Sequence, residues 1–280
     1  MTIPIRAPLK VLVIGLALAG TLAGTLAGCN RDKPAATAAT APAAGAAVTP
    51  AEAAAPMAYE SKTPYAEVKL TLPIAINSQP DLHAALYARS VADLREFTEG
   101  AQADRTEAGG DAGMGPYDKS IEVTPGAETG KLFSLIRTDR EFTGGAHPNS
   151  SYLSILWDKA LKREITAADL FTKGADLSAL DTALCAAINA EKKKRDPEAP
   201  TVSMTGDGLT CPRAATTPFV LAQGVTPGKA GGLLFLIAPY LVGSYSEGSF
   251  EITVPQSAFR GMIAPAYADE FSGEPKPAAA

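Results

Sequence analysis

The chain has 280 residues and a formal net charge of −5, with 46% hydrophobic but only 6% aromatic residues. This length is enough for one large domain or two small ones with a substantial core. The acidic balance disfavours a nucleic-acid partner and provides no broad basic surface for anionic lipids.

The first 28 residues have the three parts of a secretory signal. Arg6 and Lys10 form a positive start, and an apolar run of 18 residues rich in Leu, Ala and Gly follows from residue 11 to 28. This order is typical of an export signal. The run ends in Leu-Ala-Gly before Cys29, which resembles the lipobox of bacterial lipoproteins. The alternative is a plain transmembrane anchor. The run is short and contains Gly and Thr, so it is at the lower limit of what can span a hydrocarbon core of ~30 Å.

We therefore expect residues 1–28 to be a lipoprotein signal peptide and Cys29 to carry the lipid that attaches the chain to a membrane. Asn30 follows the Cys, whereas an Asp there would resemble the inner-membrane retention signal, so a periplasm-facing protein on the outer membrane is expected. Residues 29–58 are expected to be a disordered tether, because 13 of the 23 residues in Pro34–Pro56 are Ala and 4 are Pro. Such a segment buries too little apolar surface to offset its ordering entropy.

The first part of the expected folded region consists of a strand, a helix and further strands. Alternating apolar residues predict a strand over 67–77. Helical spacing then predicts a helix over 81–99, with Asp81 as its N-cap and His83 at the surface. A Gly-rich stretch over 101–116 indicates a flexible loop. Short strands are predicted over 119–124, 131–140 and 151–157.

The second part has the same order of elements. Thr166-Ala-Ala-Asp169 resembles a capping box, and apolar spacing predicts a long helix over 176–195 whose basic last turn suits the helix dipole. Strands are predicted over 219–222, 232–238 and 249–254. This succession predicts an α+β fold with antiparallel sheets and two long helices. We expect two adjoining subdomains, residues 59–150 and 151–271, and a disordered tail at 272–280.

Three cysteines are present, and lipidation of Cys29 leaves Cys185 and Cys211. Two remaining thiols in an oxidising compartment usually pair, and a loop of this length would make the disulfide worth ~3 kcal/mol. A catalytic Cys or a metal ligand is the alternative, although neither Cys has a nearby His and no C-x-x-C is present.

Motifs for catalysis or cofactor binding are absent from the sequence. The two histidines, His83 and His147, form no H-E-x-x-H pair, and there is no G-x-S-x-G, S-x-x-K or phosphate-binding loop. Carboxylates are plentiful, but their pairing for acid–base chemistry cannot be derived from sequence. We therefore expect no catalytic residues, no metal and no cofactor, and a protein that is not an enzyme.

Two segments could instead bind a ligand. Residues 141–149 contain a Gly-Gly pair before His147 and form either a tight turn between strands or a recognition loop. Residues 238–248 contain two Tyr and form either a loop packed on a sheet edge or a contact surface. The candidate ligand-binding residues are Gly144, Gly145, His147, Asn149, Tyr240, Tyr245 and Glu247.

These segments also carry a resemblance to a known family. The Gly-Gly-Ala-His turn at 144–147, Asp-Leu-Phe at 169–171, Tyr-x-Val-Gly-x-Tyr at 240–245 and Glu-x-Thr-Val-Pro at 251–255 together resemble the PdaC/RsiV-like extracytoplasmic domains. Family members often have Pro at the position of Ser244 and Ala at that of Ser246. The resemblance covers about residues 65–259. It implies an α+β fold in two adjoining parts, without catalysis.

The first hypothesis is a non-enzymatic envelope lipoprotein that binds a wall-associated ligand, either peptidoglycan or a lysozyme-like cationic protein. A hydrolase acting on the cell wall or on an ester is the second, and carboxylates converging on His147 in a concave pocket would indicate it. The third is a structural subunit of an envelope assembly, which a large exposed apolar patch would indicate.

Overall fold

The computed structural model describes residues 55–109 and 115–277. The expected signal peptide, Cys29 and most of the expected tether lie outside these ranges. The residues in these two ranges belong to one compact unit. Within the described ranges, no helix combines the length and hydropathy that a membrane span requires.

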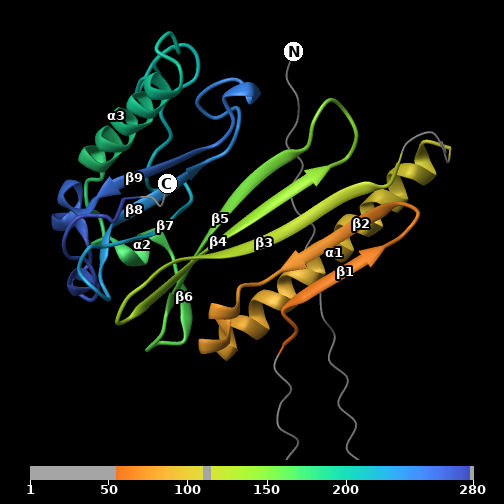
Figure 1. Cartoon of the computed structure of the whole chain (residues 1–280), viewed down its shortest axis with the longest axis horizontal. Coiled ribbons are helices and arrows are strands. Elements are labelled where there is room, and N and C mark those ends of the chain that lie inside the picture. The colour runs from red at the N-terminus through yellow and green to blue at the C-terminus, as the bar shows by residue number, and fades with distance from the viewer. Residues whose placement is uncertain (1–54, 110–114, 278–280) are drawn as a thin grey trace, which may run out of the picture. The chain divides into compact units, whose positions relative to one another are not determined.

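The first part of the fold is a six-stranded sheet crossed by a long helix, α1 (Pro80–Glu107) (Figure 1). Its strands, in spatial order, are β1 (Ala58–Lys62), β2 (Ala66–Thr71), β3 (Tyr117–Glu128), β4 (Leu132–Phe142), β5 (Asn149–Asp158) and β6 (Arg163–Ile165). All neighbours pair antiparallel except β2 and β3, which are parallel. A parallel pair needs a long crossover connection, and α1 provides it.

The second part is a three-stranded antiparallel sheet of β7 (Phe219–Gln223), β8 (Ala230–Ile237) and β9 (Phe250–Pro255). The short helix α2 (Ala167–Leu170) and the long helix α3 (Ser178–Arg195) precede it, and α3 packs against β9. Single 3-10 turns are η1 (Ile74–Ser78), η2 (Tyr245–Glu247), η3 (Gln256–Ala258), η4 (Arg260–Met262) and η5 (Ala268–Glu270). The predicted α+β class with two long helices is confirmed.

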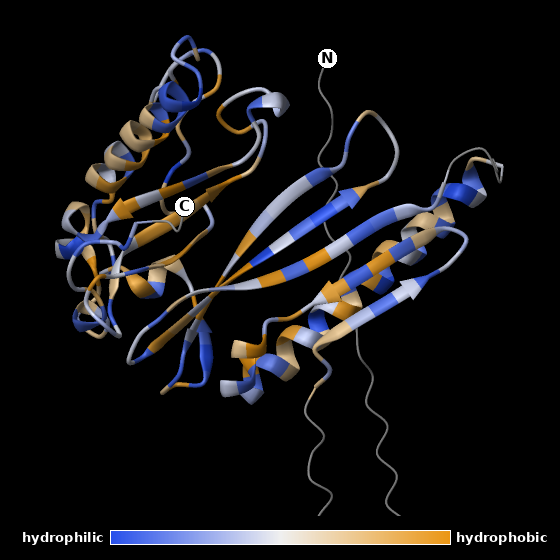
Figure 2. Ribbon diagram, viewed as in Figure 1, coloured by the Kyte–Doolittle hydropathy of each residue, from blue (hydrophilic) through white to orange (hydrophobic). Residues whose placement is uncertain are grey.

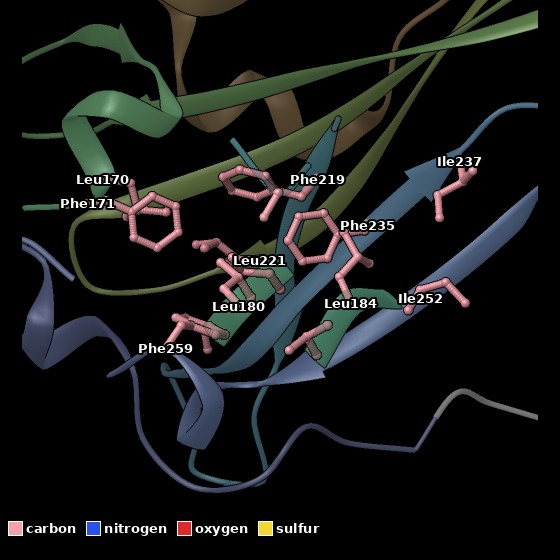
Figure 3. Packing of buried hydrophobic residues seen from close by; sticks show 14 of the residues in the cluster. Leu170, Phe171, Leu180, Leu184, Phe219, Leu221, Phe235, Ile237, Ile252 and Phe259 are labelled. Atoms are coloured by element: carbon pink, nitrogen blue, oxygen red, sulfur yellow. The ribbon is translucent and has the colours of Figure 1, made fainter. Parts of the chain in front are cut away.

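Two hydrophobic cores lie beneath the helices, and the strands carry apolar residues toward them (Figure 2). Helix α1 buries Leu82, Leu86 and Leu94 completely, which belong to the core of the six-stranded sheet. In the other core, Leu180 and Leu184 of α3 belong to the same buried cluster as Phe219 and Phe235 (Figure 3). Complete burial of each such Leu stabilises the fold by about 1.5–3 kcal/mol.

Strand β7 joins the two sheets through side-chain hydrogen bonds. The Ser134 hydroxyl in β4 accepts from the Leu221 amide at 3.2 Å, and the Ser154 hydroxyl in β5 accepts from the Phe219 amide at 2.6 Å. Strand β5 pairs with β4 along its length, so the first residues after the expected subdomain boundary at 150 continue the first sheet. The division of the folded region into 59–150 and 151–271 stays a prediction.

Several predicted elements need correction. The strand predicted over 67–77 ends at Thr71, because Pro73 lacks the amide that a ladder needs, and residues 74–78 form η1 instead. The loop predicted over 101–116 is wrong for its first seven residues, which continue α1 to Glu107. Helix α1 begins before Asp81, with Gln79 at the N-cap, and β1 and β6 were not predicted at all.

The exposure predicted for His83 is also wrong. His83 was expected at the surface, but it is 3% exposed and its Nε2 lies 3.1 Å from the Pro56 carbonyl oxygen. At the other end, the ordered chain continues past Phe271, the expected limit of the fold. The Lys276 amide donates to the Gln223 carbonyl at 2.7 Å, and the Val225 amide donates to Glu274 at 2.9 Å.

Other local predictions are confirmed. Thr166 and Asp169 form the predicted capping box at the start of α2, with the Thr166 amide donating to the Asp169 carboxylate at 2.8 Å. Cys185 and Cys211 are joined by the predicted disulfide across a separation of 26 residues. The disulfide attaches α3 to the long segment that connects it to β7.

Candidate functional site

The turn between β4 and β5 contacts the segment that follows β8, and both were singled out in the sequence. Gly144 and Gly145 have φ values of 97° and 98°, which glycine adopts without steric cost, so the chain can reverse tightly before His147. No atom lies within 4 Å of a Cβ built on Gly145, so its surface is open. The turn thus presents His147 toward Tyr240 and Tyr245 of the other segment.

His147, Tyr240 and Tyr245 form what we call the aromatic cluster. The rings of His147 and Tyr245 are stacked, with centroids 3.5 Å apart and planes 12° apart. The two tyrosine rings have centroids 5.5 Å apart at an interplanar angle of 39°. Three rings from two remote segments therefore pack together and form one partly exposed surface, held by stacking and by hydrogen bonds at its edges.

Hydrogen bonds fix the tautomer of His147. Its Nδ1 lies 3.2 Å from the Pro148 carbonyl oxygen, and because a carbonyl can only accept, Nδ1 carries the proton. In the neutral imidazole, Nε2 then accepts from the Tyr240 hydroxyl at 2.9 Å. The Tyr245 hydroxyl donates to the same Pro148 carbonyl at 2.9 Å. One carbonyl with two lone pairs thus positions both the imidazole and the phenol.

Tyr240 is the most unusual residue of the aromatic cluster. Its φ of 72° lies in the left-handed region, where a residue with a Cβ is disfavoured by about 1–2 kcal/mol. The residue is nevertheless 53% exposed, so burial in the core does not explain its position. Backbone conformations of this strained kind cluster at active sites and ligand-binding sites.

Glu247 is turned away from this surface and toward α3. Its Oε2 accepts from the Lys192 ammonium at 2.8 Å, and its Oε1 accepts from the Ser244 amide at 3.0 Å. The pKa of Glu247 lies below its usual value, and the hydrogen bond from Lys192 is the largest cause of this lowering. Burial acts in the opposite direction and raises the pKa. Glu247 therefore fixes the conformation of its own loop and does not extend the aromatic surface.

Lys192 is a residue that the sequence analysis missed. Its side chain is 1% exposed, and its ammonium also donates to the Val242 carbonyl at 2.5 Å. The basic run at the end of α3 was explained by the helix dipole alone, and nothing in the run distinguishes Lys192 from Lys193 or Lys194. Helical spacing was the available signal, because Lys192 lies four residues after the buried Ile188.

Arg195 supports the same loop from the last turn of α3. Its guanidinium donates to the carbonyl oxygens of Glu247 and Ser249, at 3.1 Å and 2.9 Å, and lies 4.0 Å from the centroid of the Phe250 ring. Asn149, the remaining candidate, is exposed at the start of β5 and pairs through its backbone with Glu141. In the described ranges, no side-chain hydrogen bond joins it to the aromatic cluster.

The arrangement provides ring faces and hydrogen-bonding edges. The polar partners of His147 among the described residues are a hydroxyl and a carbonyl. The part of the chain that the structure describes also contains no group of three or more His, Cys, Asp or Glu placed to hold a metal ion. The aromatic cluster thus offers ring stacking and hydrogen bonding.

Comparison with known proteins gives a family match and two similar structures. Residues 168–257 match the family model described as "Protein of unknown function (DUF3298)". A search of the curated proteins finds no match. A DUF3298-family crystal structure from Bacteroides fragilis is 20% identical, with a TM-score of 0.51 and coverage of 73% of this chain and 88% of that one. A second, from Pseudomonas aeruginosa, is 17% identical, with a TM-score of 0.44 and coverage of 78% and 94%.

The matched segment contains α3, the disulfide, and both tyrosines of the aromatic cluster, whereas His147 precedes it. The likeness to the Bacteroides fragilis structure concerns the fold alone. Residues 168–257 are thus similar to the DUF3298 family, and the fold around them is similar to that of a solved member of that family.

Proposed function

We propose that the protein is a lipid-anchored, non-enzymatic protein of the cell envelope, with a PdaC/RsiV-like domain whose aromatic cluster binds a wall-associated ligand. The observation that carries the proposal is the conformation of Tyr240, which is exposed, strained and hydrogen-bonded to His147. A strained conformation at an exposed aromatic residue has no benefit for the core. It does keep the ring in place before a ligand arrives, which lowers the entropy cost of binding.

Between the two wall-associated ligands, the geometry favours a glycan strand of peptidoglycan over a cationic protein. Aromatic rings offer a large, rigid contact area with a polar edge, which suits the apolar face and the hydroxyl rim of a sugar. A cationic partner would instead need free carboxylates. Glu247, the acidic residue of this loop, is already paired with Lys192.

The proposal is tested by the retention of the full-length protein on purified peptidoglycan sacculi. His147→Ala, Tyr240→Ala and Tyr245→Ala should each reduce retention at least fivefold while unfolding remains cooperative. Tyr59→Ala is the matched control, because Tyr59 is half-buried in β1, at the opposite edge of the six-stranded sheet from β5 and β6. A parallel titration with lysozyme tests the cationic partner. Retention and lysozyme binding that are unchanged in all three variants would reject the aromatic cluster as the site.

Lipid attachment at Cys29 has its own test, since this residue lies outside the described ranges. Metabolic labelling with a fatty-acid probe should mark the wild-type protein and leave Cys29→Ser unmarked. Cell fractionation should place the wild type with the outer membrane. An unlabelled wild-type protein found in the cytosol would remove the basis for both the envelope location and the wall ligand.

A further inference from the structure

A cavity of about 630 Å³ lies on the other side of the loop that carries Tyr245. Its walls are residues 200–203 and 206–209 of the segment after α3, residues 242–244 and Glu247 of the loop, and Lys192 of α3. A volume of this size is within the range of small-molecule sites, ~300–1,000 Å³. The same loop therefore contributes Tyr245 to the aromatic cluster and Ser244 to the wall of the cavity.

Both walls are held in place by specific contacts. On one side, the Asn189 side chain both donates to and accepts from the backbone of Val202, each at 2.8 Å. The Cys211 amide donates to the Ser203 carbonyl at 2.8 Å, so the disulfide to Cys185 braces the same wall. On the other side, Lys192 holds the loop through its bonds to Glu247 and Val242. The cavity is thus preformed before any ligand enters.

The polar groups of the lining suit a neutral ligand with many hydroxyls. Thr201, Ser203 and Ser244 contribute hydroxyls. The Ser203 hydroxyl donates to the Thr205 carbonyl and the Ser244 hydroxyl is bonded to that of Ser246, but each oxygen has a further lone pair that can accept from a ligand. The Lys192 ammonium lies behind this lining, 1% exposed and bonded to Val242 and Glu247, so it positions the wall.

The charge and polarity of the lining argue against other ligand classes. The charges of Lys192 and Glu247 offset each other, which leaves the carboxylate of the exposed Asp207 and disfavours an anion. A wholly apolar ligand would not use the remaining hydrogen-bonding capacity of these hydroxyls and would desolvate it at a cost. No aromatic residue lines the cavity, so recognition there depends on hydrogen bonds and on aliphatic contacts such as those of Val242.

We propose that this cavity is a saccharide subsite that works together with the aromatic cluster, so that one oligosaccharide contacts both sides of the loop. The inference rests on the proposed function and makes it more specific. One sugar unit is hydrogen-bonded in the cavity, and a neighbouring unit stacks on the rings. Ser244 and Tyr245, adjacent in sequence, connect the two subsites.

The probe is chitotetraose, a soluble β-1,4-linked tetramer of N-acetylglucosamine, titrated calorimetrically into the full-length protein. Thr201→Trp places an indole in the cavity at an exposed position whose side chain makes no hydrogen bond with the described residues. It should weaken chitotetraose binding at least tenfold. Thr71→Trp is the matched control, because Thr71 is an exposed residue of β2 in the other sheet, and it should leave the affinity unchanged.

The outcomes separate this inference from the proposed function. If Thr201→Trp binds chitotetraose as tightly as wild type while Tyr240→Ala binds weakly, the cavity is not a subsite and the aromatic cluster remains the site. Binding to sacculi or lysozyme without any binding of chitotetraose would also overturn the saccharide subsite alone. If chitotetraose binds and neither variant changes its affinity, both the subsite and the proposed role of the aromatic cluster are wrong.

Discussion

The imidazole of His147 lies flat on the ring of Tyr245, with centroids 3.5 Å apart and planes 12° apart. The Tyr245 hydroxyl also donates to the carbonyl of Pro148, which lies 97 residues earlier in the sequence. Stacking and this hydrogen bond attach the turn between β4 and β5 to the loop after β8. The sequence marks each of these two segments separately as a candidate for ligand binding, and the structure brings them into contact.

The strain at Tyr240 can be separated from the contribution of its ring. Tyr240→Gly removes the ring and also the steric cost of φ 72°, whereas Tyr240→Ala removes the ring and keeps the strain. In denaturant unfolding, the Gly variant should be more stable than the Ala variant by about 1 kcal/mol. Both should bind sacculi equally weakly. Equal stability of the two variants would contradict the strained backbone.

Lys192 and Glu247 should behave as a coupled pair. Glu247→Gln leaves the ammonium of Lys192 buried with the Val242 carbonyl as its other acceptor, so we expect the free energy of unfolding to fall by about 3 kcal/mol. Lys192→Met keeps the packing and should cost less, because the Glu247 side chain is 26% exposed and can be hydrated. The double variant should be more stable than Glu247→Gln alone. Simple additivity of the two single changes would show that the pair is not coupled.

The disulfide between Cys185 and Cys211 should stabilise the C-terminal core and the wall of the cavity. On the loop-entropy model, a separation of 26 residues corresponds to about 3 kcal/mol. Dithiothreitol should therefore lower the midpoint of thermal unfolding of the wild type and leave that of the Cys185→Ser/Cys211→Ser variant unchanged. A reductant effect of equal size in both proteins would exclude the disulfide as its cause.

Alkaline pH should destabilise the fold through Tyr267. Burial, followed by the hydrogen bond that the hydroxyl donates to Asp158 at 2.9 Å, raises the pKa of Tyr267 to about 12. An unfolded Tyr titrates near pH ~10. The protonated form is thus favoured in the folded state, so this stabilisation is complete below pH ~10 and is lost as the pH rises toward about 12.

The loss should reach about 2–3 kcal/mol near the upper end of that range. Tyr267→Phe keeps the ring and cannot titrate, so its unfolding free energy should fall less steeply than that of the wild type between pH ~10 and ~12. Parallel curves for the two proteins would contradict the raised pKa of Tyr267.

Local sequence patterns predicted much of the fold because the interactions behind them are themselves local. Apolar spacing located α3 through Leu180, Leu184 and Ile188, and the Thr166–Asp169 pair located the start of α2. The 67–77 strand was extended too far because alternation continues past Pro73, where the missing amide ends the ladder. An alternating pattern of apolar residues alone does not indicate that the backbone amide of Pro73 is missing.

The contacts that make up the site depend on tertiary structure and were beyond local patterns. His83 is buried because the chain at Pro56 folds back onto α1, and Lys192 is buried because a loop some 50 residues later provides its acceptors. Composition marked His147, Tyr240 and Tyr245 as candidates, but their contact depends on the packing of β7 against β4 and β5. The cavity beside Ser244 could not be predicted for the same reason, because segments distant in the sequence form its walls.

The central claim is that a wall glycan binds at the aromatic cluster, and the histidines provide the most direct test. The chain has two histidines, and His83 is 3% exposed whereas His147 belongs to the cluster. Protein labelled isotopically at histidine should be titrated with soluble peptidoglycan fragments while its imidazole carbon–proton resonances are recorded. We predict that the resonances of His147 shift in a saturable manner and that those of His83 stay fixed. Binding detected by calorimetry without any shift at His147 would contradict the claim.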